Sequence, residues 1–442
     1  MKTFLTGTLF LIIAAFIGEC FEFVINMILA RELGEEGMGH YMSILPVMFF
    51  IVVLASFELP ISISKYVAER EKKHHWPMLK NAFQLAIWIT LLFSLLTFLL
   101  LPRMPFFQHY HPVILWLFLI LIPMISFSSI ARGFFMGTHQ MGKIAFSNGF
   151  RKFVQLGLLV LLFQVFEFHH ELALLAAISA FIGSEAIVVI YLLSTYVLQT
   201  KELVSVAKNE ISTKEIRQRL FHVSVPTTVL RIFHSLTHAI QPFLIKMALV
   251  NAGLSQTAAV EQFGLLSGVA MTIGFFPAFI AHSLLIVLIP SVSEAYANRD
   301  FALLKKLLQQ SMLITFLYGI PAVMIIFSFG DSLTKLFFHM SSASYYLKML
   351  WPYFFFHFLI IPLQAYLIGL NLIKDALFHT IWSHIVAFSI IYILGSMHEW
   401  QMSGVIIGLN AGGVLQFLLH YITICQKIGV TYFTLTRKQM TG

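Results

Sequence analysis

Residues 112–136 read PVILWLFLILIPMISFSSIARGFFM, 25 positions in which Arg132 is the only charged residue. An α-helix needs about 20 apolar residues to cross the hydrocarbon core of a bilayer, whereas a membrane-spanning strand needs about 9–11. The run is therefore predicted to be a transmembrane helix, and its length excludes a strand of a β-barrel.

The same apolar character extends over the whole chain of 442 residues, which is 59% hydrophobic and 11% charged. Soluble domains carry about 25% charged residues, and a soluble fold this apolar would expose aggregating patches. We predict an all-α polytopic membrane protein with about 12 transmembrane helices. The predicted spans are 3–30, 41–66, 81–102, 112–136, 147–167, 172–199, 220–250, 264–293, 306–330, 346–370, 376–396 and 403–425.

The formal net charge of +8 is not distributed as in a nucleic-acid-binding protein. Basic residues lie in short loops, mainly those after even-numbered spans, and no aromatic residues alternate with them. This positive-inside pattern places both termini in the cytoplasm of a protein in the cell membrane. The first apolar run is too long for a signal peptide, so we interpret it as a retained helix. Cys20 and Cys425 have no metal-like spacing, and we expect no disulfide framework, metal or cofactor.

Two halves of the chain show matching helix ends. Gly137 aligns with Gly369 at an offset of 232 residues, and Pro60 aligns with Pro290 at an offset of 230. We predict two pseudo-symmetric six-helix lobes of the same topology, as in transporters whose halves are related by an axis along the membrane normal. The alternative is chance similarity between apolar helix ends. The predicted regions are an N-terminal lobe at 1–199, a cytoplasmic linker at 200–219, a C-terminal lobe at 220–425 and a cytoplasmic tail at 426–442.

Charged side chains within spans identify the candidate site, because each costs about 2.5–3.5 kcal/mol to insert and usually faces a cavity or a partner. Spacings of three and four residues place such groups on one face of a helix. The first span carries an acidic stripe of Glu19, Glu22 and Asn26. The seventh carries a basic stripe of Thr227, Arg231, His234, His238 and Gln241, with Lys246 near its outer end. Further candidates are Glu58 in the second span and Arg132 in the fourth.

If the two stripes face each other, they line a shared central cavity. Opposite charges across it could then form a gate, and the preferred pair is Arg231 with Glu19 or Glu22. The histidines titrate near neutral pH and could couple transport to protons. The alternative is a fixed ion pair that only holds helices together. Glu185, alone in the sixth span, is interpreted as a satisfied polar contact.

A near-match to a phosphate-binding loop at 137–144 does not indicate ATP hydrolysis. The position that needs Ser or Thr for Mg²⁺ is Ile144, and no strand precedes the motif. We expect no enzymatic activity, and energy from an ion gradient, the membrane potential or the substrate gradient.

Residues 29–41 read LARELGEEGMGHY, residues 59–69 read LPISISKYVAE and residues 132–137 read RGFFMG. These segments resemble the first loop and the second and fourth helix ends of polysaccharide-type exporters in the multidrug/oligosaccharidyl-lipid/polysaccharide (MOP) flippase superfamily. The resemblance is greatest to the branch that includes stage V sporulation protein B. It implies a MATE-like fold, alternating access and a lipid-linked saccharide substrate, such as a peptidoglycan precursor or another envelope or spore-cortex precursor. The expected partners are membrane lipids, that substrate and H⁺ or Na⁺, and we expect a monomer.

Two departures from those relatives leave other functions open. Relatives in the precursor and sporulation branches usually have fourteen helices, and the precursor flippase lines its first two helices with arginines. Here that stretch is acidic, with Arg31 at the outer rim, so anion binding would fall to Arg132, Arg231, Lys246 and the histidines. The alternatives are a cation-coupled multidrug exporter of the same fold and a non-transporting sporulation membrane organiser.

Overall fold

The computed structural model describes residues 2–104, 107–108, 110–166, 168, 170–206 and 213–429, and the regular structure within these ranges is helical. The helices of the first half are α1 (Lys2–Ser56), α2 (Leu59–Glu69), α3 (His75–Leu100), α4 (Val113–Gly137), α5 (Met141–Val165), α6 (His170–Val206) and α7 (Thr213–Asn251). Those of the second half are α8 (Gln256–Gly264), α9 (Met271–Phe275), α10 (Phe279–Ala297), α11 (Phe301–Leu333), α12 (Ser344–Met349), α13 (Trp351–Gly369), α14 (Ile373–Gly395) and α15 (Gln401–Ile428).

Ten stretches of the described chain are long and apolar enough to cross a membrane. One of them, Ala15–Glu69, covers the second predicted span and the part of the first from Ala15 onward. The seventh predicted span forms α7, which is not among the ten and which carries the predicted basic stripe. The prediction of an all-α polytopic membrane protein is therefore confirmed.

The second predicted span is interrupted, contrary to the prediction of a continuous helix over 41–66. Phe57 and Glu58 both have a φ of 46°, in the left-handed region, and α2 begins at Leu59. Pro60 is the cause, because a proline cannot donate the backbone hydrogen bond of a helix interior and restricts the residue before it. In the first turn of α2 its missing N–H group costs nothing. The break fixes Glu58 between two helices.

The described chain forms two compact units, which we call the N-unit (His40–Ile240) and the C-unit (Met1–Gly39 with Gln241–Gly442). These units cross the lobe boundaries predicted at 199 and 220, because the first part of α1 packs with the second half and the first part of α7 packs with the first half. Much of the predicted linker 200–219 is helical as well, since α6 continues to Val206 and α7 begins at Thr213. Residues 207–212 and 430–442, which hold the rest of the predicted linker and most of the predicted tail, lie outside the described residues.

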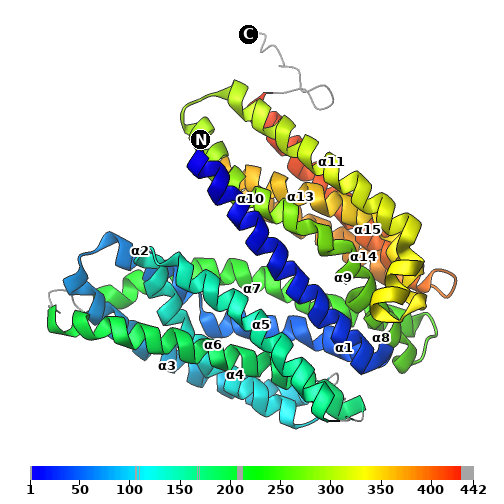
Figure 1. Cartoon of the computed structure of the whole chain (residues 1–442), viewed down its shortest axis with the longest axis horizontal. Helices are drawn as coiled ribbons and strands as arrows, with labels where there is room; N and C mark the ends of the chain where they lie inside the picture. Colours follow the sequence, from blue (N-terminus) through cyan, green and yellow to red (C-terminus); the bar gives the residue numbers. More distant parts are fainter. Residues whose placement is uncertain are drawn as a thin grey trace. The chain divides into compact units, whose positions relative to one another are not determined.

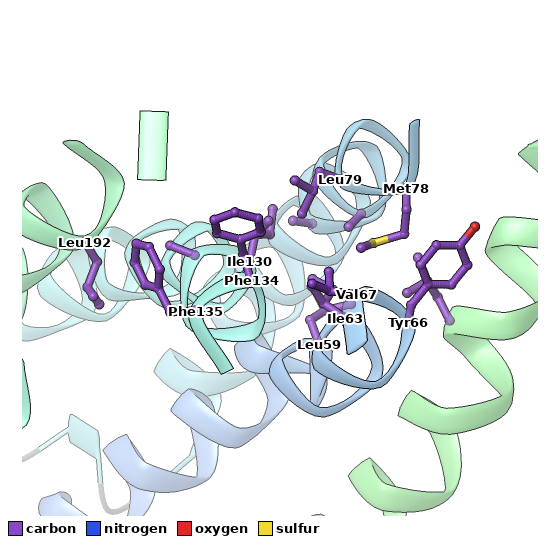
Figure 2. Close-up of a cluster of buried hydrophobic side chains, with 14 of the residues drawn as sticks. Leu59, Ile63, Tyr66, Val67, Met78, Leu79, Ile130, Phe134, Phe135 and Leu192 are labelled. Atoms are coloured by element: carbon purple, nitrogen blue, oxygen red, sulfur yellow. The ribbon is translucent and has the colours of Figure 1, made fainter. Parts of the chain in front are cut away.

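The core of the N-unit lies where α4 packs against α2, α3 and α6, with α5 along α6 (Figure 1). Leu59, Ile63 and Val67 of α2 belong to one buried cluster with Phe134 and Phe135 of α4, and Phe135 lies toward Leu192 of α6 (Figure 2). The cluster continues into α7, where Ile216 and Leu220 are buried. The start of α7 is thus held against α2 by apolar packing, which brings the polar faces of these two helices together.

The C-unit packs α13 against α10, α11 and α15, and α14 against α15. Its link to the first helix depends on glycines of the 29–41 motif. A Cβ atom on Gly39 would overlap the carbonyl oxygen of Val260, and one on Gly264 would lie 2.6 Å from the amide nitrogen of Gly39. The motif therefore has a packing role at the crossing of α1 and α8.

The predicted equivalence of Gly137 and Gly369 is supported by their contacts. A Cβ atom on Gly137 would lie 2.6 Å from Cβ of Val67, and one on Gly369 would lie 2.7 Å from Cβ of Val292. In each unit a helix end thus crosses a valine of a neighbouring helix at backbone distance. These matching crossings favour the predicted duplication.

The second predicted anchor is wrong. The contact valines, Val67 and Val292, are 225 residues apart, which differs from the offset of 230 between Pro60 and Pro290. The two prolines occupy different positions, since Pro60 lies in the first turn of α2 and Pro290 lies inside α10. Their similar sequence surroundings do not reflect structural equivalence.

Replacing Gly137 with alanine should destabilise the protein by about 1–3 kcal/mol, because the added methyl group overlaps Val67 and the helices must separate. The matched control is Gly149→Ala on α5, where an added Cβ meets no atom within 4 Å. This control should be neutral or stabilising by up to about 1 kcal/mol, because alanine favours helix more than glycine does. Thermal unfolding of both variants in one detergent measures the difference, and equal melting temperatures would contradict the close crossing.

Candidate functional site

An ion pair joins α2 to α7 at the break in the second predicted span. Nη1 of Arg231 donates to Oε1 of Glu58 at 2.7 Å. The Glu58 side chain is 2% exposed, whereas that of Arg231 is 60% exposed. A hydrogen bond between two charged groups is stronger than a neutral one. The arrangement therefore holds a buried carboxylate with a guanidinium that still has open N–H groups on its exposed side.

Two serines extend this polar contact along the same helices. The hydroxyl of Ser224 donates to that of Ser62 at 2.8 Å, and both residues are buried. Ser62 lies one turn after Glu58, and Ser224 lies two turns before Arg231, so the two contacts follow each other along two antiparallel helices. We call the set Glu58, Ser62, Ser224 and Arg231 the α2–α7 seam. Thr227 does not join it, because its hydroxyl donates to the carbonyl of Val223 in its own helix.

The partner of Arg231 differs from the preferred prediction, which paired it with Glu19 or Glu22. Glu58 was a candidate, but its burial depends on the break at residues 57–58 and on the packing of α7 against α2. Neither feature follows from the spacing of charges within one helix. Glu19 and Glu22 are half-buried on α1 in the C-unit.

The remaining members of the two stripes divide between the units. In the N-unit, the rings of His234 and His238 lie 4.9 Å apart, and both side chains are exposed. In the C-unit, Nδ2 of Asn26 donates to the hydroxyl of Thr272 at 3.4 Å. Because the acidic stripe lies in one unit and Arg231 in the other, a cavity lined by both stripes stays a prediction.

Two further candidates lie beyond the unit boundary in α7. The ammonium group of Lys246 lies 5.0 Å from the ring centroid of Phe243, a cation–π contact. Gln241 lines a small cavity of about 50 Å³ together with Tyr353 and His384. Lys246 therefore has a local partner in the C-unit, and Gln241 faces a cavity there.

Arg31, predicted at the outer rim, has a defined structural contact. Its Nε donates to the carbonyl of Phe337 at 2.8 Å, and its Nη2 donates to that of Leu336 at 3.0 Å. These carbonyls end the π-helix Thr334–Phe338, where backbone acceptors lack helical partners. Arg31 therefore caps this helix end in the C-unit.

A second charged cluster in the N-unit contains the candidate Arg132 together with Arg151 and Glu185, which were not predicted as site residues. Nε of Arg151 lies 3.2 Å from Oε1 of Glu185, and both side chains are largely buried. Nη1 of Arg132 donates to Oδ1 of Asn148 at 3.1 Å. Within the described residues, the second carboxylate oxygen of Glu185 is buried without a hydrogen-bond partner. The interpretation of Glu185 as a satisfied contact is thus only half correct. The available signal was Arg151, a charged residue inside the predicted span 147–167 and inside α5 that was not named as a candidate.

Polytopic helical units with ion pairs inside their spans are typical of membrane transporters, and the comparisons define the class as the MOP transporter and flippase superfamily. The family model "Polysaccharide biosynthesis protein" matches residues 4–296, and the chain belongs to this family. A second model, "MatE", matches residues 243–393. The superfamily predicted from the sequence motifs is confirmed.

Curated relatives come from Bacillus subtilis (strain 168). The chain is 51% identical to "Sporulation protein YkvU" over 98% of this chain and 97% of that protein. It is 30% identical to "Stage V sporulation protein B", with 97% and 85% covered. It is 23% identical to "Lipid II flippase MurJ", with 87% and 76% covered.

Solved structures show the same fold. An inward-facing multidrug resistance MATE family transporter of the MOP superfamily matches with a TM-score of 0.72 at 15% identity, covering 93% of this chain and 94% of that one. An outward-facing structure of such a transporter matches with a TM-score of 0.65 at 17% identity, with 95% of each chain covered. The predicted MATE-like fold is confirmed.

Proposed function

We propose that the protein translocates a lipid-linked saccharide with a phosphate or pyrophosphate group across the cell membrane by alternating access. The observation that carries the proposal is the Glu58–Arg231 pair, in which the guanidinium is bound on one side and exposed on the other. Relatives named as a lipid II flippase and as sporulation proteins favour an envelope or spore-cortex precursor over other amphiphiles. In this proposal the protein acts as a monomer with both termini in the cytoplasm and catalyses no chemical step.

The proposed mechanism is an exchange of partners at Arg231. Guanidinium groups bind phosphate in a bidentate geometry, so a substrate phosphate that binds the open N–H groups of Arg231 competes with Glu58 for the charge of the same guanidinium. When the phosphate binds, the α2–α7 seam loses its strongest contact. The two helices can then separate, and the pair forms again after the headgroup leaves.

Cation coupling follows from the burial of Glu58. A carboxylate that is 2% exposed cannot remain charged and unpaired without a large desolvation cost. When the substrate takes Arg231, Glu58 must bind H⁺ or Na⁺ or become hydrated. This exchange gives a physical link between an ion gradient and substrate movement, with Glu58 as the coupling group.

The test uses the purified protein in proteoliposomes with a fluorescent saccharide on a pyrophosphate-linked polyprenol. We expect protein-dependent movement of this probe between leaflets and at least a tenfold slower movement of the corresponding saccharide lipid without phosphate. The multidrug-exporter alternative predicts transport of a cationic dye instead. The organiser alternative predicts that neither probe moves faster than in protein-free liposomes, and either outcome would overturn the proposal.

A further inference from the structure

A cavity of about 410 Å³ lies between α2 and the start of α7 within the N-unit, next to the α2–α7 seam. Small-molecule sites have volumes of about 300–1,000 Å³, so it is large enough for a small polar group. Ser62 of the seam lines it, as do Lys65, Tyr66, Gln218 and His222. It is distinct from the Glu58–Arg231 pair, since neither residue lines it.

Tyr66 gives an independent sign that the cavity takes a ligand. Its side chain is 5% exposed, and its hydroxyl is buried without a hydrogen-bond partner among the described residues. The ring packs at the edge of the apolar cluster with Leu59 and Ile63, and the hydroxyl points away from them (Figure 2). Buried hydroxyl groups in proteins nearly always have a partner. A group bound in the cavity would supply it after a small shift of the Tyr66 side chain, which lines the cavity.

The charges that line the cavity restrict the chemistry of that group. Lys65 offers donors and positive charge and His222 offers ring nitrogens, whereas Glu69 offers an acceptor for hydroxyl groups. Arg219 is already paired with Glu215 at 3.0 Å. A purely anionic ligand would be repelled by the two carboxylates, and an apolar one would leave these groups without partners. A sugar that carries a phosphate matches both sets.

We propose that this cavity binds a phosphorylated sugar, with the phosphate at Lys65 and His222 and the sugar hydroxyls at Glu69, Gln218 and Tyr66. If the source is the lipid-linked substrate, which rests on the proposed function, the cavity holds the headgroup one step before Arg231. The basic residues that follow α2 place this end of the seam on the predicted cytoplasmic side. If the source is a soluble sugar phosphate, the cavity is a regulatory site at the same place.

The test measures binding of N-acetylglucosamine 1-phosphate to the full chain in nanodiscs by calorimetry. Lys65→Gln should weaken binding about tenfold through loss of a charge-assisted hydrogen bond. Tyr66→Phe should weaken it about threefold or more while the melting temperature stays the same or rises, because this change removes one hydroxyl. Lys72→Gln, outside the cavity on the same side, is the matched control and should change nothing. No binding by the wild-type chain, or equal binding by all four proteins, would overturn the proposal that the cavity binds a soluble sugar phosphate.

A second arm distinguishes the source and separates this inference from the proposed function. In proteoliposomes, the Lys65 and Tyr66 variants should slow the pyrophosphate-linked probe if the cavity receives the lipid headgroup. If the soluble sugar phosphate binds with the expected variant dependence but the lipid probe never moves, the site stands and the proposed function fails. If the lipid probe moves equally in all variants and the soluble probe does not bind, the cavity proposal fails and the proposed function stands.

Discussion

Replacing Arg231 with methionine is expected to destabilise the purified protein much more than replacing Glu58 with glutamine. The first change leaves a carboxylate that is 2% exposed without its partner, and an unpaired buried charge costs about 3–5 kcal/mol. The second leaves a guanidinium that is 60% exposed, and loss of a solvated pair costs about 0–1 kcal/mol. Thermal unfolding in one detergent measures both. Equal losses would show that the open side of Arg231 faces acyl chains, because a charge in lipid is as costly as a buried one.

Transport should respond differently from stability. Both single variants are expected to slow the pyrophosphate-linked probe at least tenfold. Arg231→Met removes the guanidinium that binds the phosphate, and Glu58→Gln removes the carboxylate that exchanges with the phosphate. The double variant, Glu58→Gln with Arg231→Met, has no unpaired charge and should regain most of the lost stability. It should remain inactive if the pair acts in transport.

The control for these variants is Arg217→Met. Arg217 is an exposed arginine on the same helix and donates to Gln84 at 2.8 Å. It should keep wild-type stability within about 0.5 kcal/mol and wild-type transport. A double Glu58–Arg231 variant that recovers transport together with stability would identify the pair as a fixed structural contact.

The helical membrane fold could be predicted from the sequence because the bilayer imposes one strong condition on length and polarity. A run as long and apolar as 112–136 can form little other than a membrane-spanning helix. It forms α4 (Val113–Gly137), which differs from the predicted span by a residue or two at each end. The superfamily followed from short motifs for a similar reason. Gly39 and Gly137 lie where two helix backbones meet, so the residue type there is fixed by geometry.

The grouping of helices into units and the partners of the charges could not be predicted, because both depend on contacts between distant segments. The spacing of Arg231 and His234 gives the face of α7 but not the helix opposite it. Pro60 was a visible signal for the break, yet its effect on Glu58 depends on where α2 restarts. Arg151 lies near the start of the predicted span 147–167, and hydropathy alone cannot locate a helix start closely enough to show that such a charge is buried.

The Arg151–Glu185 pair should respond differently from the Glu58–Arg231 pair, because both of its members are buried. Their side chains are 18% and 11% exposed, so neither can regain water when the other is removed. Arg151→Met and Glu185→Leu should each destabilise the protein by about 3–5 kcal/mol, with no strong asymmetry between them. The double variant should lie close to wild type, because apolar side chains of similar volume often replace a buried ion pair without loss. Thermal unfolding of the three variants and the wild type gives the interaction free energy between Arg151 and Glu185.

Arg132→Met is the matched comparison for this pair, since among the described residues Arg132 donates to Asn148 and interacts with the carboxylate of Glu185 only through its charge, without an ion-pair contact. It should cost about 1.5–3 kcal/mol, the range for a hydrogen bond that involves a charged group. A loss as large as that of Arg151→Met would mean that both guanidinium groups share the charge of Glu185, whose second oxygen is buried without a described partner. The Arg151–Glu185 double variant would then remain unstable, because Arg132 would be left as the uncompensated charge. The stability of that double variant therefore decides whether this cluster is one ion pair with a neighbour or a network of three charges.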